Sequence, residues 1–148
     1  TVIRDPLERF KSCIKQFIGY GEINSVEKIF DIAINSNFNN IDLKKGIDWS
    51  NEKESIALHS LSIFHPFLNV FDEKNRPKAG NLVDFEFIKR DLSKILPDKD
   101  LSNLPHENKS KNHRVNLTDS QLFKFKKKFK EDILFFKKFK DGKLWKII

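Results

Sequence analysis

The chain has 148 residues, of which 39% are hydrophobic and fifteen are Phe, so it can bury a core and is not a disordered protein. Its single cysteine, Cys13, excludes an internal disulfide and a zinc site built from cysteines. No apolar run reaches the length of a membrane span, and no signal peptide opens the chain. Any anchor or targeting segment is therefore expected outside this sequence.

The first residues predict a short strand that leads directly into a helix. Thr1-Val2-Ile3 is β-branched and apolar, which is typical of the end of a buried strand. Asp5 is a good N-cap, Pro6 suits the first helical position, and Glu8 completes a pattern similar to a capping box. A helix is therefore expected to begin at Asp5 or Pro6 and to end near Gly19.

Arg4 and Ser12 are the first candidate ligand-binding residues. Arg4 lies at the predicted junction of strand and helix, and Ser12 lies about two turns into the helix. A guanidinium can hold a phosphate through two parallel N–H bonds, and a hydroxyl can add a third donor. The alternative is that the pattern marks only a helix start and that Arg4 is only a surface charge.

The middle of the chain is predicted to alternate helices with short strands, because helical spacing of apolar residues gives way twice to short extended runs. The elements expected are a helix capped by Asn24 or Ser25 that ends near Asn35, a loop over 36–51, a helix after Ser50, a short strand within 67–71, a strand over 82–85 and an amphipathic helix over 86–96.

The C-terminal part is predicted to form one long helix that starts after Thr118, where Gln121 completes a capping box. Residues 122–148 contain ten lysines against three acidic residues, a net charge of +7, and the rest of the chain is neutral. Lysines are expected to fill the face opposite the apolar one. The residues of the predicted buried face are Leu122, Phe125, Phe129, Ile133, Phe136 and Phe139.

The segment Val-Ile-Arg-Asp-Pro-Leu-Glu-Arg-Phe-Lys-Ser resembles the 3′-phosphate-binding motif of the sulfotransferases that use 3′-phosphoadenosine 5′-phosphosulfate. That motif reads Arg-x-Pro-x-x-Arg-x-x-Ser after a strand, and Arg4, Pro6, Arg9 and Ser12 match it. The resemblance implies that Arg4 and Ser12 hold the 3′-phosphate of the nucleotide. We interpret Arg9 as a support for the loop and helix.

Two later segments resemble the same family. Phe85-Glu86 followed by Asp91-Leu92 is similar to its strand that ends in Phe-Glu and runs into a helix containing Asp-Leu. Leu-Pro-His-Glu-Asn-Lys-Ser at 104–110 is similar to a late segment of the carbohydrate-type members. This resemblance implies that Lys109 and Ser110 contact the phosphates of the cofactor. The alternative is a solvated loop whose basic residues bind nothing in particular.

His59 and His65 are the candidates for contacts with the acceptor. The family commonly carries a His-x-x-Pro-Gln element in this region, and the chain has an altered version that ends in His65-Pro66. For each histidine the alternative is a packed or exposed structural role.

The resemblance implies an α/β fold: a partial P-loop-like sulfotransferase domain, mostly helical with a few short parallel strands, forming a single domain over 1–148. It implies transfer of a sulfuryl group to a hydroxyl of a carbohydrate or related acceptor, without a metal. Because no phosphate-cradling loop is present, we expect the 5′-phosphosulfate ligands and the catalytic base upstream of Thr1, and we expect the chain alone to be inactive. The bacterial cytoplasm is the favoured location, or the Golgi membrane in a eukaryote.

The main alternative is a nucleic-acid-binding module that uses the Lys-rich C-terminal helix. Basic helices bind phosphate backbones, but the Phe residues there have core spacing and no known binding motif is present, so a nucleic acid is not the expected partner. A basic helix on an anionic membrane surface ranks third, because Leu144, Trp145, Ile147 and Ile148 make an apolar tail.

Overall fold

The computed structural model describes residues 1–20, 23–36, 48, 50–65, 68, 70–72, 74, 78, 81–102, 104 and 114–142. Over these residues the fold is mostly helical with two short parallel strands, which is compatible with a small α/β fold. The chain forms two compact units, each assembled from separate stretches. The first unit contains 1–6, 63–109 and 131–148, and the second contains 7–62 and 110–130. The single domain stays a prediction.

The first unit contains the sheet. Strands β1 (Val2–Ile3) and β2 (Val83–Asp84) pair in parallel, with Val2 opposite Val83 and Ile3 opposite Asp84. The N–H of Val83 donates to the carbonyl of Thr1 at 2.8 Å. After β2 the chain forms a 3₁₀ turn, η3 (Phe85–Phe87), and then helix α4 (Ile88–Ile95). The strands predicted before Arg4 and within 82–85 are therefore both present, as β1 and β2.

The core of the first unit is small and aromatic. Ile3, Phe71, Leu82 and Phe135 are buried together. Phe135 lies on α6 (Lys130–Lys140), and its ring contacts those of Phe64 and Phe71 with centroids 5.5 and 5.1 Å apart. Phe136 and Phe139 pack against this cluster from the same helix. The cluster fixes β1 through the side chain of Ile3, directly before Arg4.

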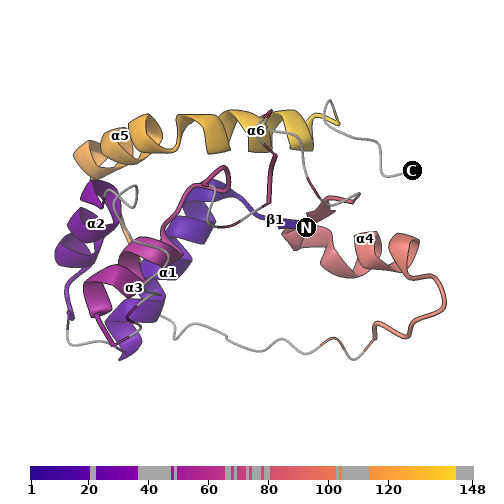
Figure 1. Ribbon diagram of the computed structural model, residues 1–148, viewed down its shortest axis with the longest axis horizontal. Coiled ribbons are helices and arrows are strands. Elements are labelled where there is room, and N and C mark those ends of the chain that lie inside the picture. Colours follow the sequence, from indigo (N-terminus) through magenta and orange to yellow (C-terminus); the bar gives the residue numbers. More distant parts are fainter. Residues whose placement is uncertain are drawn as a thin grey trace. The chain divides into compact units, whose positions relative to one another are not determined.

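The second unit is built from α1 (Pro6–Tyr20), α2 (Val26–Asn35), α3 (Glu52–His59) and α5 (Asp119–Lys128) (Figure 1). Pro6 is the first residue of α1, as predicted. The predicted N-cap of α2 is confirmed by a hydrogen bond from the N–H of Lys28 to Ser25, and the capping box of Thr118 with Gln121 is present at α5. Local capping chemistry therefore predicted where these helices begin.

Phe10 lies at the centre of the second unit. Its ring contacts the rings of Phe30, Phe125 and Phe129, with centroids 5.7, 5.1 and 5.5 Å apart. Helices α1, α2 and α5 are therefore joined by one aromatic cluster. Cys13 is buried beside α3, where its thiol lies 3.9 Å from the carbonyl of Ile56, and burial raises the pKa of that thiol to about 12.

Three predictions about the elements need correction. The C-terminal helix is not continuous, because α5 ends at Lys128 and its C-cap residue Phe129 has φ −102° and ψ 27°. The ring of Phe129 is packed into the Phe10 cluster, so packing overrides the helical pattern there. The helix expected over 86–96 begins with the 3₁₀ turn and becomes α-helical only at Ile88. In the described part of 67–71, Phe71 forms only a single bridge instead of a strand.

The buried face of α6 also differs from the prediction. Asp132 and Phe135 are buried, whereas the predicted Ile133, Phe136 and Phe139 are half-buried. The periodic pattern missed Asp132 because a carboxylate is expected to face water. Its oxygen instead accepts the N–H of Ile63 at 2.9 Å.

Candidate functional site at the carboxyl edge of the sheet

The parallel pairing of β1 and β2 places two chemistry-bearing segments at one edge of the sheet. Arg4 follows directly after β1, and the segment from Asp84 to Phe87 ends β2 and forms the 3₁₀ turn. The carboxyl edge of parallel strands is where α/β folds commonly bind their ligands. We therefore take this edge as the candidate site.

Arg4 lies beside an aromatic ring, and the described residues give its side chain no carboxylate partner. Its guanidinium carbon is 4.8 Å from the centroid of the Phe85 ring, within the range of a cation–π contact. Within the described ranges no hydrogen bond or ion pair engages its side chain, which is half-buried. Its N–H donors are therefore available to an anion, so far as the described residues are concerned.

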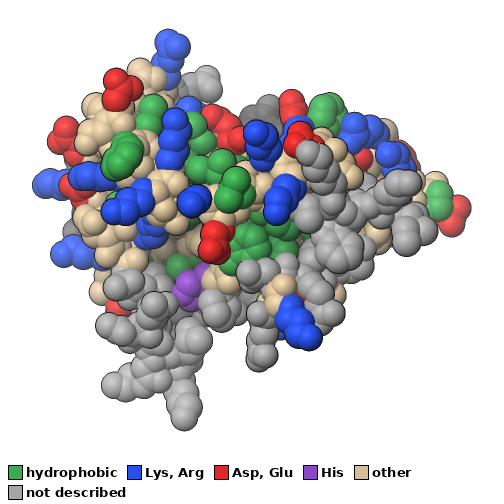
Figure 2. Space-filling view, turned by 90° about the horizontal axis from the view of Figure 1, so that it is seen from above, with side chains coloured by type: hydrophobic (Ala, Val, Ile, Leu, Met, Phe, Trp, Pro, Cys, Tyr) green, Lys and Arg blue, Asp and Glu red, His purple; other side chains and the backbone are tan. Residues whose placement is uncertain are grey.

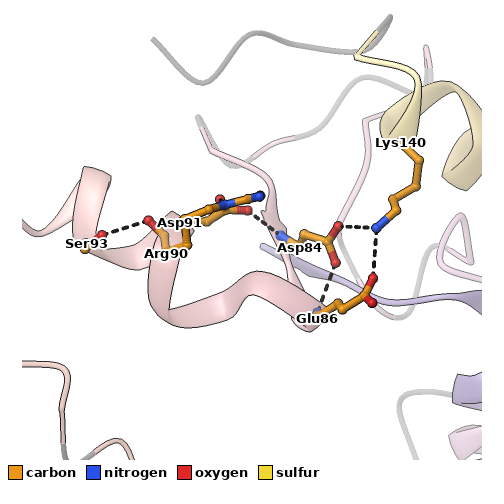
Figure 3. Close-up of polar contacts among 6 residues, drawn as sticks. All are labelled: Asp84, Glu86, Arg90, Asp91, Ser93 and Lys140. Atoms are coloured by element: carbon orange, nitrogen blue, oxygen red, sulfur yellow. Dashed lines mark hydrogen bonds and ion pairs between the residues drawn. The ribbon is translucent and has the colours of Figure 1, made fainter.

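Asp84 organises the end of β2 (Figure 3). One of its carboxylate oxygens accepts the N–H of Glu86 at 3.0 Å and so caps the 3₁₀ turn. The other oxygen accepts a hydrogen bond from Nζ of Lys140 at 2.9 Å, and Lys140 also donates to Glu86 at 3.0 Å. These hydrogen bonds to two carboxylates raise the pKa of Lys140. Lys140 therefore ties α6 to the end of β2.

The carboxylate of Asp91, on α4, accepts a hydrogen bond from the backbone of Asp84 (Figure 3). Its side chain is 1% exposed, and one oxygen accepts the backbone N–H of Asp84 at 3.1 Å. The other oxygen accepts Nε of Arg90 at 2.8 Å, and this hydrogen bond is the main cause of the lowered pKa of Asp91. Helix α4 therefore fixes the backbone of β2 through a charged hydrogen bond.

Two partly exposed rings lie beside these charges. Phe85 is 42% exposed and Phe87 is 41% exposed. Arg90 lies 4.3 Å and Lys140 lies 5.0 Å from the centroid of the Phe87 ring. Arg90 and Lys140 both have carboxylate partners, so Arg4 is the cation at this edge that the described residues leave unneutralised. The arrangement suits the binding of an anion at Arg4.

Ser12 lies on α1, two turns after the start of that helix, and its side chain is half-buried. The described residues provide no hydrogen-bond partner for its hydroxyl. Arg4 lies before the start of α1 and belongs to the first unit, whereas Ser12 lies on α1 in the second unit. That Arg4 and Ser12 hold the same phosphate stays a prediction.

His59 and His65, the predicted acceptor contacts, have different surroundings. His59 is exposed at the end of α3, where Nδ1 is 2.8 Å from the carbonyl of Ser55 and the ring meets Phe17 edge to face. His65 is half-buried, and its burial lowers its pKa. Their contacts with an acceptor stay a prediction.

Lys109 and Ser110, the other predicted phosphate contacts, lie outside the described residues. The residues that the structure describes contain no group of three side chains suited to a metal ion. They also contain no helix that is long and apolar enough to cross a membrane.

The sequence prediction missed the network of Asp91, Arg90 and Lys140. One signal was present for Asp91, which falls between Ile88 and Leu92 on the inward side of an amphipathic helix. No comparable signal was present for Lys140, because its partners lie more than fifty residues earlier in the chain.

Comparison with known proteins found no protein-family model, no curated protein and no solved structure that matches the chain. The resemblance to sulfotransferases therefore stays a prediction that depends on its motifs.

Proposed function

We propose that the chain is the part of a sulfotransferase that binds the 3′ end of 3′-phosphoadenosine 5′-phosphosulfate, in a P-loop-like α/β domain. The observation that carries this proposal is the position of Arg4, which follows a parallel strand at the carboxyl edge of the sheet and has no carboxylate partner among the described residues. An unneutralised guanidinium at such an edge suits a phosphate.

In this proposal the nucleotide donates a sulfuryl group to a hydroxyl of a carbohydrate or related acceptor. Arg4 and Ser12 hold the 3′-phosphate and so orient the donor, and Lys109 and Ser110 add phosphate contacts. His59 and His65 are the proposed acceptor contacts. The S–O bond to the nucleotide breaks as the acceptor oxygen bonds to sulfur, and a base outside the residues named here takes the hydroxyl proton.

Calorimetry with 3′-phosphoadenosine 5′-phosphate tests the proposal. Arg4→Ala and Ser12→Ala are each expected to weaken binding by ~1–3 kcal/mol, because each removes donors to a charged phosphate. Lys11→Ala is the matched control, since Lys11 is a cation beside Ser12 on the same helix and already pairs with Glu8 at 3.1 Å. The control is expected to bind like the wild type.

Adenosine 5′-phosphate separates the 3′-phosphate from the rest of the ligand. The wild type should bind the bisphosphorylated nucleotide more tightly, and Arg4→Ala should remove most of that preference. If both nucleotides bind equally to the wild type, or if the preference survives in Arg4→Ala, the proposal fails. Single-stranded DNA is titrated in parallel as the ligand of the alternative function, and its binding should not depend on Arg4 or Ser12.

A further inference from the structure

Helix α5 exposes a second set of cations around an aromatic ring. Phe123 is 69% exposed, and Lys126 and Lys127 follow it by three and four residues on the same helix. Residues at these spacings are neighbours on a helix surface, about 5–6 Å apart at Cβ. We call these three residues the Phe123 face, and exposed Lys124 flanks it. Figure 2 shows hydrophobic side chains exposed among Lys and Arg side chains in its view of the surface.

The described residues make no use of the lysines of this face or of Lys124. The described part of the chain provides no hydrogen bond or ion pair to the side chains of Lys124, Lys126 or Lys127. The next residue, Lys128, is different: its Nζ donates to the carbonyls of Ala33, Ile34 and Ser36 at 2.7, 2.9 and 3.3 Å. The same lysine run therefore contains one structural cation and three that remain available to an anion.

Phe123 is also not used within the fold. Phe125 and Phe129 are the core residues of this segment, and both contact Phe10. Among the large hydrophobic residues described as exposed, Phe123 has the greatest exposed fraction. An exposed ring beside lysines offers a flat apolar surface next to positive charge, which is the combination that single-stranded nucleic acids recognise.

We propose that the Phe123 face binds single-stranded nucleic acid, with a base stacked on the ring and the neighbouring phosphates on Lys126 and Lys127. This site is separate from the one proposed at Arg4. A membrane surface fits less well, because Phe125 is buried and Phe123 is the one aromatic side chain that α5 exposes. Duplex DNA fits less well, because its bases are stacked already and cannot use the ring. Asp119, one turn before Phe123, is the acidic residue on this side of α5.

Fluorescence anisotropy with a labelled single-stranded oligonucleotide and the matching duplex tests the proposal on the full chain. Phe123→Ala is expected to weaken single-strand binding by roughly five- to a hundredfold, as loss of one stacked base should, and to leave duplex binding nearly unchanged. Phe123→Trp keeps a ring for stacking and should bind the single strand at least as tightly as the wild type. Leu134→Ala removes another exposed apolar side chain and should have no effect.

The salt dependence tests the lysines. Lys126→Gln with Lys127→Gln should reduce the slope of log affinity against log salt by about 1.4, since each phosphate contact on a single strand contributes about 0.7. Lys28→Gln with Lys53→Gln is the matched control, because it removes two exposed lysines from α2 and α3 of the same unit. Both double variants should give the same circular dichroism spectrum as the wild type.

The proposal is overturned if single strands do not bind, or if the two double variants lose the same slope. It is also overturned if Phe123→Ala binds like the wild type, or if anionic vesicles or a sulfated glycan bind in preference to the single strand. Arg4→Ala should bind the single strand normally, so this test and the nucleotide test can fail independently.

Discussion

Cations lie beside partly exposed Phe rings both at the carboxyl edge of the sheet and on the Phe123 face of α5. The two surfaces differ in whether these cations are paired with carboxylates. At the edge of the sheet, Lys140 and Arg90 pair with Asp84, Glu86 and Asp91. On α5, the described residues offer Lys126 and Lys127 no partner. A paired cation mainly fixes the fold, whereas an unpaired one keeps its donors for a ligand.

The comparison identifies Arg4 as the exception at its own edge. It shares the surroundings of Lys140 and Arg90, but the described residues place an aromatic ring beside it instead of a carboxylate. Lys128 is the corresponding exception on α5, because it is engaged by three carbonyls while its neighbours are not. If paired cations are structural and unpaired cations bind ligands, substitution of a paired cation should mainly lower stability, and substitution of an unpaired one should mainly weaken binding.

Loss of Asp91 should have the largest effect on stability. Asp91→Ala removes a buried carboxylate and leaves the N–H of Asp84 and the guanidinium of Arg90 without this acceptor. We expect the free energy of unfolding to fall by about 2–4 kcal/mol in urea denaturation. Asp98→Ala, an exposed residue shortly after α4, is the control and should change it by less than about 0.5 kcal/mol. Equal effects of the two variants would show that the network does not hold β2.

Loss of Lys128 should have the next largest effect. Its ammonium uses three donors on the carbonyls of Ala33, Ile34 and Ser36, at the end of α2, where the helix dipole is negative. Lys128→Ala is expected to lower the free energy of unfolding by about 1–2 kcal/mol. Lys127→Ala is a matched control one residue away, with an expected change below about 0.5 kcal/mol. The distinction between paired and unpaired lysines fails if the two variants are equally stable.

At alkaline pH the contributions of Lys128 and Lys140 to the free energy of unfolding should change in opposite directions. Hydrogen bonds to Asp84 and Glu86 raise the pKa of Lys140, so its contribution is complete below about 10.4, the ordinary lysine value, and is lost as the pH rises through the raised pKa. Burial lowers the pKa of Lys128, so the folded state releases that proton first and gains stability as the pH rises towards the ordinary value.

Stability curves against pH for Lys140→Met, Lys128→Met and the wild type test these signs. The stability difference between the wild type and Lys140→Met should shrink above about pH 10.4. The difference between the wild type and Lys128→Met should grow below that pH, as the pH rises. If both stability differences change in the same direction with pH, the pKa values of Lys140 and Lys128 are not shifted in opposite directions.

Much of the fold could be predicted from local chemistry. Pro6 is the first residue of α1, as its fixed φ favours. Ser25 and Thr118 begin their helices through capping bonds to residues three positions later in the chain. The strand before Arg4 and the strand at 82–85 were also predicted from their composition, although only Val83 and Asp84 of the second form β2. Local signals located these helix starts, although they missed the 3₁₀ turn that Asp84 caps at Glu86.

The remaining features depend on contacts between distant residues. The break at Phe129 arises where its ring joins Phe10, more than a hundred residues earlier. The pairing of Lys140 with Asp84 and the engagement of Lys128 by α2 likewise connect distant segments. In the sequence all three lie within one periodic, Lys-rich pattern, and that pattern cannot distinguish an engaged lysine from an exposed one.

Loss of Arg4 should have the smallest effect on stability, although it should have a large one on nucleotide binding. Among the described residues its side chain makes a cation–π contact with Phe85, and such contacts contribute about 0.5–1 kcal/mol at exposed sites. Arg4→Ala should therefore lower the free energy of unfolding by no more than about 1 kcal/mol. A loss as large as that of Asp91→Ala would mean that Arg4 is a structural cation, and nucleotide binding lost in that variant could no longer be assigned to a missing phosphate contact. A near-neutral change together with loss of the 3′-phosphate preference would place Arg4 among the ligand-binding cations, as its lack of a carboxylate partner among the described residues predicts.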